Sequence, residues 1–212
     1  SNLFSHTDGG KYIIFSINKN YIEKFKGAFM TVYDFIPGKA PTKITPNMAF
    51  ALGEFLGEFH VRSKKFNKNL NSRRRFYDLN SSVIRKMKPI VKQQTDPMLK
   101  SIINEIERGI VLNNPSSKLP SGPIHVDIGH NNELFIKNKL TGIIDFGNFY
   151  KGPFMIDVGK TIMWNCCVGG VLNMKLFNKF MEGYISKRQL NTSETKYIYI
   201  NLYFTLFIVI FG

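Results

Sequence analysis

PIHVDIGHNNELFIKNKLTGIIDFGNFYKGPFMID, residues 123–157 of the 212-residue chain, contains two short apolar runs with polar residues at their ends. Leu134–Lys137 and Thr141–Ile144 have the apolar and β-branched character of strands. Only Asn138-Lys139 separates the two runs, which is the length of a tight hairpin turn. The stretch therefore predicts a two-stranded hairpin with polar side chains gathered at its base.

Three polar side chains flank this hairpin. Asp127 and, five residues later, Asn132 precede it, and Asp145 follows its second strand. In phosphoryl transfer a carboxylate accepts or orients the proton of the attacking hydroxyl, and Asp127 is suited to that role. Mg²⁺ takes hard oxygen ligands, which the Asn132 amide and the Asp145 carboxylate provide. A lone Asp beside a turn is usually an Asx-turn residue, but the three together favour metal-phosphate chemistry.

These motifs resemble those of the family that contains aminoglycoside phosphotransferases, choline kinases and homoserine kinases. His125-Val126-Asp127-(x)4-Asn132 is similar to the family motif H-G/A-D-(x)4-N, and Ile144-Asp145-Phe146 is similar to its I-D-F motif. Leu119–Asp127, LPSGPIHVD, resembles the L-P-x-G-x-I-H-A-D segment of bacterial homoserine kinases.

Further matches lie upstream in the expected order. Val32–Gly38 is similar to the family's strand-to-hinge pattern, and Leu52–His60 is similar to its L-G-x-x-L-A-x-x-H helix. The resemblance covers most of the chain, from about Thr7 to Tyr184. It implies an α+β, protein-kinase-like fold with a mostly helical C-lobe and a residual antiparallel strand pair of the N-lobe. Residues 1–36 would form the N-lobe strands and hinge, and residues 37–212 a catalytic C-lobe that is incomplete at its end.

The resemblance also implies roles for single residues. Asp127 would be the catalytic base, with His125 bracing its loop, and Asn132 and Asp145 would bind Mg²⁺. At the hinge, backbone groups of three residues would meet the adenine of ATP: Tyr33, Asp34 and Phe35.

Two other polar residues would support this site. Asp157 falls on the aspartate that follows the metal loop in the family, and His60 would pack beneath the catalytic loop. A histidine on an apolar helix face is usually a core residue with satisfied hydrogen bonds, and that interpretation of His60 is kept beside the functional one.

The implied function is ATP-dependent phosphorylation of a hydroxyl on a small amino-bearing alcohol, with homoserine as the first candidate acceptor. The partners would be the nucleotide and this small molecule, and the sequence leaves the oligomeric state open. Gly147 stands where homoserine kinases often carry an aromatic residue, which favours hydroxylysine, choline or aminoglycosides as alternative acceptors.

A catalytically dead remnant is a further alternative, because the family's Gly-rich phosphate loop and strand lysine have no counterpart in this chain. Nothing before Thr7 provides them, and Gly9-Gly10 indicates a hairpin turn. Without that lysine the nucleotide phosphates lack a main counter-charge. We therefore expect the chain alone to turn over more slowly than roughly 1 s⁻¹, or not at all.

The net charge of the chain raises the question of a nucleic-acid partner. With 29 Lys and Arg against 15 Asp and Glu, the formal net charge is +14, which favours anionic partners. The basic residues are spread along the chain, only Arg73–Arg75 forming a tight run, and no reading helix or stacking platform accompanies them. A nucleic-acid partner is therefore not expected.

Two further features bear on the compartment. Cys166 and Cys167 are adjacent, which allows neither a disulfide framework nor a cysteine zinc site and favours a reducing, cytoplasmic setting. Tyr197–Phe211 is almost continuously apolar but shorter than the roughly 18–20 residues of a membrane span. It predicts a buried core helix, and no membrane association is expected.

Local patterns predict the remaining elements. Apolar runs at Lys11–Asn18 and Gly27–Ile36 indicate an antiparallel strand pair. Thr45 as N-cap and Pro46 at the first position begin an amphipathic helix that ends near Arg62. Gly53 and Gly57 inside it indicate close packing against another element. The other predicted helical segments are 81–93, 97–112 and, with an interruption at Gly169-Gly170, the chain from Met155 onward.

Overall fold

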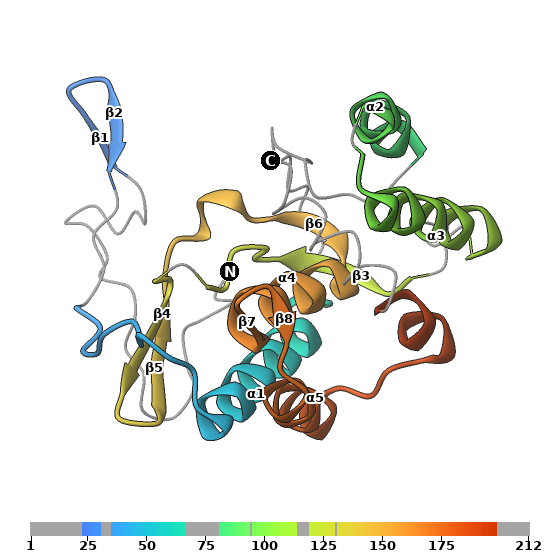
Figure 1. Ribbon diagram of the computed structural model, residues 1–212. Helices are drawn as coiled ribbons and strands as arrows, with labels where there is room; N and C mark the ends of the chain where they lie inside the picture. Colours follow the sequence, from blue (N-terminus) through green and yellow to red (C-terminus); the bar gives the residue numbers. More distant parts are fainter. Residues whose placement is uncertain are drawn as a thin grey trace.

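The computed structural model describes residues 23–30, 35–66, 81–93, 95–113, 119–129 and 131–198. Helices α1 to α5 form the body of this part, with short antiparallel strand pairs around them (Figure 1). The helices are α1 (Pro46–Ser63), α2 (Ser81–Lys92), α3 (Pro97–Asn113), α4 (Phe154–Cys166) and α5 (Met174–Lys187). The strands are β1 (Glu23–Phe25), β2 (Ala28–Met30), β3 (Ser121–Ile124), β4 (Glu133–Ile136), β5 (Lys139–Ile143), β6 (Tyr150–Pro153), β7 (Cys167–Val168) and β8 (Val171–Leu172).

The closest helix pair is α1 and α5, which lie side by side in Figure 1. Thr45 caps α1 by accepting a hydrogen bond from the Met48 amide at 3.3 Å, and Pro46 is the first helical residue, as predicted. Gly53 and Gly57 face the backbone of α5, and Gly183 of α5 faces the backbone of α1. The close packing predicted from these glycines is confirmed.

We expect Gly53→Ala to lower the free energy of unfolding by about 1–3 kcal/mol, although alanine has the higher helix propensity. A Cβ at this position would overlap the Phe180 carbonyl oxygen and lie 2.8 Å from the Tyr184 amide nitrogen, and both are backbone atoms that cannot swing away. Urea denaturation measures the loss. Val61→Ala, on the exposed side of the same helix, should change stability by less than about 0.5 kcal/mol. Equal effects of the two changes would contradict this account.

The hairpin predicted between Asn132 and Asp145 is confirmed as β4–β5, with its turn one residue earlier than expected. Lys137 and Asn138 form the turn, and Lys137 takes a left-handed φ of 56°. The boundaries shifted because polar Glu133 and Lys139 join the ladder, and an irregularity between Leu134 and Phe135 absorbs one residue. The Thr45 hydroxyl donates to the Asn138 amide oxygen at 2.9 Å, which holds the turn against the start of α1.

The β3–β6 pair had no signal in the sequence. Ser121–Ile124 pairs antiparallel with Tyr150–Pro153, so the segment before the catalytic motif lies beside the segment that follows Asp-Phe-Gly. Helix α4 begins immediately after β6. This pairing closes residues 121–153 into a compact unit at the N-terminal end of α4.

The second predicted strand is described in part, as β2. Within the described residues, β2 pairs with β1, which lies in the segment expected to link the two runs, and Lys26-Gly27 forms the turn with positive φ at both residues. Glu23–Phe25 is too short and polar to have stood out as a strand. The first predicted strand, residues 11–18, lies outside the described residues.

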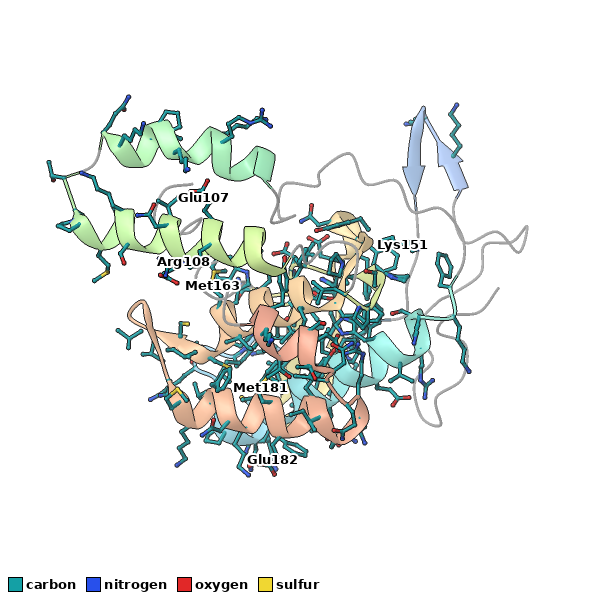
Figure 2. The ribbon with its side chains drawn as sticks, turned by 90° about the vertical axis from the view of Figure 1, so that its right-hand side faces the viewer. Glu107, Arg108, Lys151, Met163, Met181 and Glu182 are labelled. Carbon is teal, nitrogen blue, oxygen red and sulfur yellow. The ribbon has the colours of Figure 1, made fainter. Side chains whose placement is uncertain are left out.

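Helices α2 and α3 match the predicted segments and form a pair of their own. Glu107 of α3 lies between the two helices in Figure 2, and the Lys88 ammonium donates to its carboxylate at 2.6 Å.

The predicted interruption at Gly169-Gly170 is the turn between β7 and β8. Residues 199–211 of the apolar C-terminal run lie outside the described residues, but Tyr197 and Ile198 are buried. None of the helices that the structure describes has the length and apolar character to cross a membrane.

Candidate active site

Residues 125–129, called the catalytic loop below after the role that the sequence resemblance implies for Asp127, are held by a buried carboxylate at the start of α4. Asp157 is completely buried. Its Oδ2 accepts a hydrogen bond from the His125 amide at 2.8 Å, and its Oδ1 accepts one from the Val126 amide at 2.7 Å. Val126 has a φ of 62°, a left-handed conformation that strains a β-branched residue. The aspartate therefore stabilises a backbone conformation that Val126 would not adopt by itself.

Behind Asp157, a chain of hydrogen bonds crosses the core to α1 and α5. His60 Nε2 lies 3.1 Å from Asp157 Oδ2, and His60 Nδ1 lies 2.9 Å from the Tyr184 hydroxyl. Arg188 donates to that hydroxyl at 2.9 Å. Since Tyr184 accepts from Arg188, its proton goes to His60 Nδ1, and the histidine proton on Nε2 goes to Asp157.

This arrangement agrees with the charges of the buried groups. Burial lowers the pKa of His60, so the ring is neutral at pH 7. Burial alone would raise the pKa of Asp157, but the hydrogen bonds from His60 and from the loop amides hold it below its ordinary value. Asp157 is thus an ionised carboxylate whose partners are all hydrogen-bond donors.

His125 connects the catalytic loop to the end of β5. Its Nδ1 accepts a hydrogen bond from the Asp127 amide at 3.3 Å, which leaves the proton on Nε2, and Nε2 donates to the Ile144 carbonyl at 3.1 Å. The Phe146 ring meets the imidazole edge-on, with 4.5 Å between centroids. Burial lowers the pKa of His125, which suits this neutral form.

The structure brings together the three residues that the motif spacing singled out. The Asn132 side-chain amide donates to the Asp127 carbonyl at 2.9 Å, and the Ile144 amide donates to the Asn132 carbonyl at 2.9 Å. Asp145 follows Ile144 directly, is exposed, and has a left-handed φ of 60° with its Oδ1 accepting from the Gly147 amide at 3.1 Å. Asn148 donates to Asp127 Oδ2 at 3.2 Å. Backbone and side-chain contacts thus join Asp127 to Asn132, and Asn132 to the residue before Asp145, at the base of the hairpin.

Helix α4 also supports the far end of the catalytic loop. Asn165 donates to the Ile128 carbonyl at 3.0 Å. Gly129 has a φ of 144° and lies directly on Trp164, where a Cβ would overlap that side chain. One helix therefore fixes both ends of the loop that presents Asp127.

A profile of the phosphotransferase enzyme family matches residues 19–175, a range that includes Asp127, Asn132 and Asp145. The chain belongs to this family. The homoserine kinase of Neisseria meningitidis is 26% identical over 154 residues, which cover 72% of this chain and 48% of the relative. The chain spans about half the length of the curated relatives it matches.

Solved structures show the same fold at lower identity. A structure of amicoumacin kinase hAmiN in complex with AMP-PNP, Ca²⁺ and Ami has a TM-score of 0.64 at 17% identity and covers 94% of this chain and 64% of its own. An aminoglycoside phosphotransferase from Alicyclobacillus acidocaldarius has a TM-score of 0.62 at 13% identity and covers 94% and 67%. The chain thus has the protein-kinase-like fold expected from its sequence.

The donor chemistry of this candidate site fits a hard divalent cation. Because Asn132 uses its amide nitrogen toward Asp127, its amide oxygen is the atom with which it could bind a cation. Asp145 adds an exposed carboxylate. Within the part of the chain that the structure describes, no cluster of three or more His, Cys, Asp or Glu side chains could hold a metal. Mg²⁺ usually takes only one or two ligands from a protein, which an amide and a carboxylate can provide.

The hinge segment is described only in part. Tyr33 and Asp34 lie outside the described residues, and Phe35 is 88% exposed. Just beyond, Lys39 exchanges two backbone hydrogen bonds with Phe135 of β4, at 2.9 and 3.0 Å. Gly38 has a φ of 140°, and a Cβ there would lie 2.5 Å from the Thr141 hydroxyl. The chain that leaves the hinge is therefore attached to the hairpin that carries the metal-ligand candidates.

Sequence reasoning missed several side chains of this site. Asn148 follows Asp-Phe-Gly directly, but an asparagine after a turn carries no distinctive signal. Lys160 and Asn165 lie on α4 at helical spacings of three and eight from Asp157, which could have placed them on the same face. Glu133 is 5% exposed, and burial raises its pKa. Its position at the start of an apolar strand gave no indication of burial.

Proposed function

We propose that this phosphotransferase transfers the γ-phosphoryl group of ATP to the hydroxyl of a small amino-bearing alcohol, with homoserine as the acceptor. The observation that supports it best is the meeting of Asp127, Asn132 and Asp145 at the base of one hairpin. Family membership makes phosphoryl transfer the reaction class. Curated relatives are homoserine kinases, which favours a small hydroxy-amino acid as acceptor.

In this proposal Asp127 is the catalytic base. Its carboxylate takes the proton of the acceptor hydroxyl as the hydroxyl oxygen forms a bond to the γ-phosphorus and the bond to ADP breaks. Asn148 orients the carboxylate through its 3.2 Å hydrogen bond to Oδ2, and Asn132 fixes the backbone of the same residue. His125 keeps the loop attached to the segment before Asp145.

The cofactors are ATP and Mg²⁺. Asn132 and Asp145 would hold the cation, which when bound neutralises charge on the phosphates. The backbone of Tyr33, Asp34 and Phe35 would meet the adenine. Residues 1–36 would then contribute the nucleotide side of the site, and residues 37–212 the acceptor side.

An aminoglycoside or related antibiotic is the second candidate acceptor. Proteins with the same fold are named as amicoumacin and aminoglycoside kinases. Gly147, which replaces the aromatic residue common in homoserine kinases, also favours such an acceptor. A transfer assay with labelled ATP, Mg²⁺ and a panel of homoserine, hydroxylysine, choline and an aminoglycoside separates these acceptors.

We expect label transfer to homoserine at less than roughly 1 s⁻¹, because the residues of this chain include no recognisable Gly-rich phosphate loop. Transfer to the aminoglycoside alone would replace homoserine by the second candidate. Transfer to none of the four, with Mg²⁺·ATP still bound, would contradict the proposed transfer and favour the alternative of a catalytically dead chain.

Replacing Asp145 with alanine should abolish the Mg²⁺ dependence of nucleotide binding. The carboxylate is the one charged ligand in the proposed pair, and its loss leaves a single amide for the cation. Isothermal titration of ATP with and without Mg²⁺ measures this. With Mg²⁺ present, we expect the variant to bind ATP at least about tenfold more weakly than the parent chain, a difference of roughly 1.4 kcal/mol. Asp96→Ala, an exposed aspartate before α3, is the control and should bind as the parent chain does. Unchanged Mg²⁺-dependent binding in Asp145→Ala would refute the ligand assignment.

A further inference from the structure

The hydrogen-bond chain behind Asp157 continues past Tyr184 to the segment that follows α5. Arg188 is the residue directly after α5, and it donates to the Tyr184 hydroxyl at 2.9 Å and to Glu194 Oε1 at 2.6 Å. The other oxygen of Glu194 accepts from the Asn191 amide at 3.1 Å. Tyr184 and Glu194 are 0% and 1% exposed, and the Arg188 side chain is 10% exposed. A buried ion pair thus closes the far end of the chain.

The imidazole of His60 is fixed at both of its nitrogens and on its ring face. Nε2 donates to Asp157 Oδ2 at 3.1 Å, and Nδ1 accepts from the Tyr184 hydroxyl at 2.9 Å. Burial raises the pKa of Tyr184, so the hydroxyl keeps the proton that it donates. The Phe154 ring stacks on the imidazole with 4.4 Å between centroids. A half-turn of the imidazole would replace both nitrogens by carbon atoms and lose both hydrogen bonds. The orientation of the ring therefore depends on Tyr184 as well as on Asp157.

Asp157 Oδ2 is shared between this imidazole and the backbone of the catalytic loop. It accepts from His60 Nε2 and from the His125 amide, whereas Oδ1 accepts from the Val126 amide. A shift of the His60 ring would therefore displace an oxygen that holds the loop. Val126 is sensitive to such a shift, because its left-handed φ of 62° is strained and Asp127 follows it directly.

We propose that Tyr184 is a positioning residue whose hydroxyl orients His60 and, through Asp157, sets the conformation of the catalytic loop. The ion pair of Arg188 with Glu194 keeps the hydroxyl in place from the other side. This inference rests on the proposed function, in which the loop carries the catalytic base. The groups that position the loop then extend from α4 across α1 to α5 and the residues after it.

Tyr184→Phe keeps the buried ring and removes only the hydroxyl. His60 Nδ1 then lacks its donor, so we expect the loop to sample other positions and kcat to fall roughly 10–100-fold, as for a slightly misplaced catalytic group. KM for ATP should stay within about twofold, because the proposed nucleotide site lies on other elements. Ser186→Ala removes a hydroxyl of the same helix whose hydrogen bond, to the Gly183 carbonyl, stays within α5. It is the matched control and should leave both constants unchanged.

NMR of the catalytic-loop amides needs no turnover. In Tyr184→Phe the amide protons of His125 and Val126 should move upfield, because their hydrogen bonds to the Asp157 carboxylate become longer on average. Ser186→Ala should leave both signals where they are in the parent chain.

A second NMR measurement uses the parent chain with histidine labelled at the ring nitrogens. His60 is assigned by through-space contacts of its ring protons with Phe154. We expect its proton on Nε2, and Nδ1 coupled to the hydroxyl proton of Tyr184, as the direction of the hydrogen bonds requires.

These measurements separate failure of the inference from failure of the proposed function. A parent chain that transfers no phosphate to any acceptor contradicts the proposed function, and the amide signals then decide by themselves whether Tyr184 acts on the loop. Unchanged loop amides in Tyr184→Phe would overturn the inference, and so would a folded Tyr184→Phe with the kcat of the parent. If this variant does not fold, the labelled parent decides. A proton on His60 Nδ1 would overturn the inference, and an Nδ1 coupled to the Tyr184 hydroxyl supports it.

Discussion

Asp127→Asn should reduce phosphoryl transfer about 10²–10⁴-fold, the usual contribution of a general base. Asparagine keeps the size of the side chain and can still hydrogen-bond to Asn148 after an amide rotation, but it cannot take the hydroxyl proton. The Asp127 carbonyl that Asn132 contacts and the amide that His125 contacts are unaffected, because both belong to the backbone. The change is therefore expected to act on chemistry and to leave the loop in place.

Single-turnover label transfer with the chain in excess over ATP is the measurement, since it detects slow reactions. Titration with Mg²⁺·ATP should give a Kd within about threefold of the parent value, equivalent to less than roughly 0.7 kcal/mol. Asp96→Asn, the same chemical change at an exposed position, provides the control. A variant that keeps more than about a tenth of the parent rate would show that Asp127 is not the base.

The largest expected loss of stability comes from Asp157→Ala, about 3–5 kcal/mol of unfolding free energy. The change leaves three buried donors without their acceptor: the amides of His125 and Val126 and the imidazole of His60. It also removes the groups that hold Val126 in its left-handed conformation. Urea denaturation at pH 7 followed by circular dichroism gives the difference. Glu105→Ala, at an exposed residue paired only with Arg108 three positions along α3, should cost less than about 0.5 kcal/mol.

The difference in unfolding free energy between the parent chain and Asp157→Ala should become smaller at acid pH. The folded-state pKa of Asp157 is lowered from its ordinary value of 3.8, so its stabilising contribution is complete above that value. It is lost as the pH falls below 3.8 and through the lower folded pKa, because the carboxylate must then be protonated. A constant difference between pH 7 and pH 3 would show that Asp157 acts through packing and not through its charge.

Much of the local structure could be predicted from the sequence. The start of α1 followed from Thr45-Pro46, and the hairpin from two apolar runs around a short polar turn. Both depend on contacts between residues only a few positions apart, which is why local pattern predicts them. The same hairpin explains why Asp127 and Asn132, which precede it, lie near Asp145, which follows it. Its two antiparallel strands bring the chain back to the end at which the hairpin begins.

The supporting side chains could not be predicted in the same way. His60 and Asp157 are 97 residues apart, and His60 and Tyr184 are 124 apart. The β3–β6 pair joins two segments that are short and rich in glycine and proline, which local pattern assigns to loops. Lys160 is 4% exposed, a burial that no local pattern in the sequence indicated.

By itself the sequence determined which residues could carry out phosphoryl transfer and that a hairpin would draw two of them together. Only the tertiary structure decided how the loop of Asp127 is held, because that depends on α4, which contacts the loop through Asp157, Trp164 and Asn165. The physical reason is burial: a carboxylate or an ammonium is tolerated in a core only where partners from distant segments compensate it, and those partners meet only after the chain has folded.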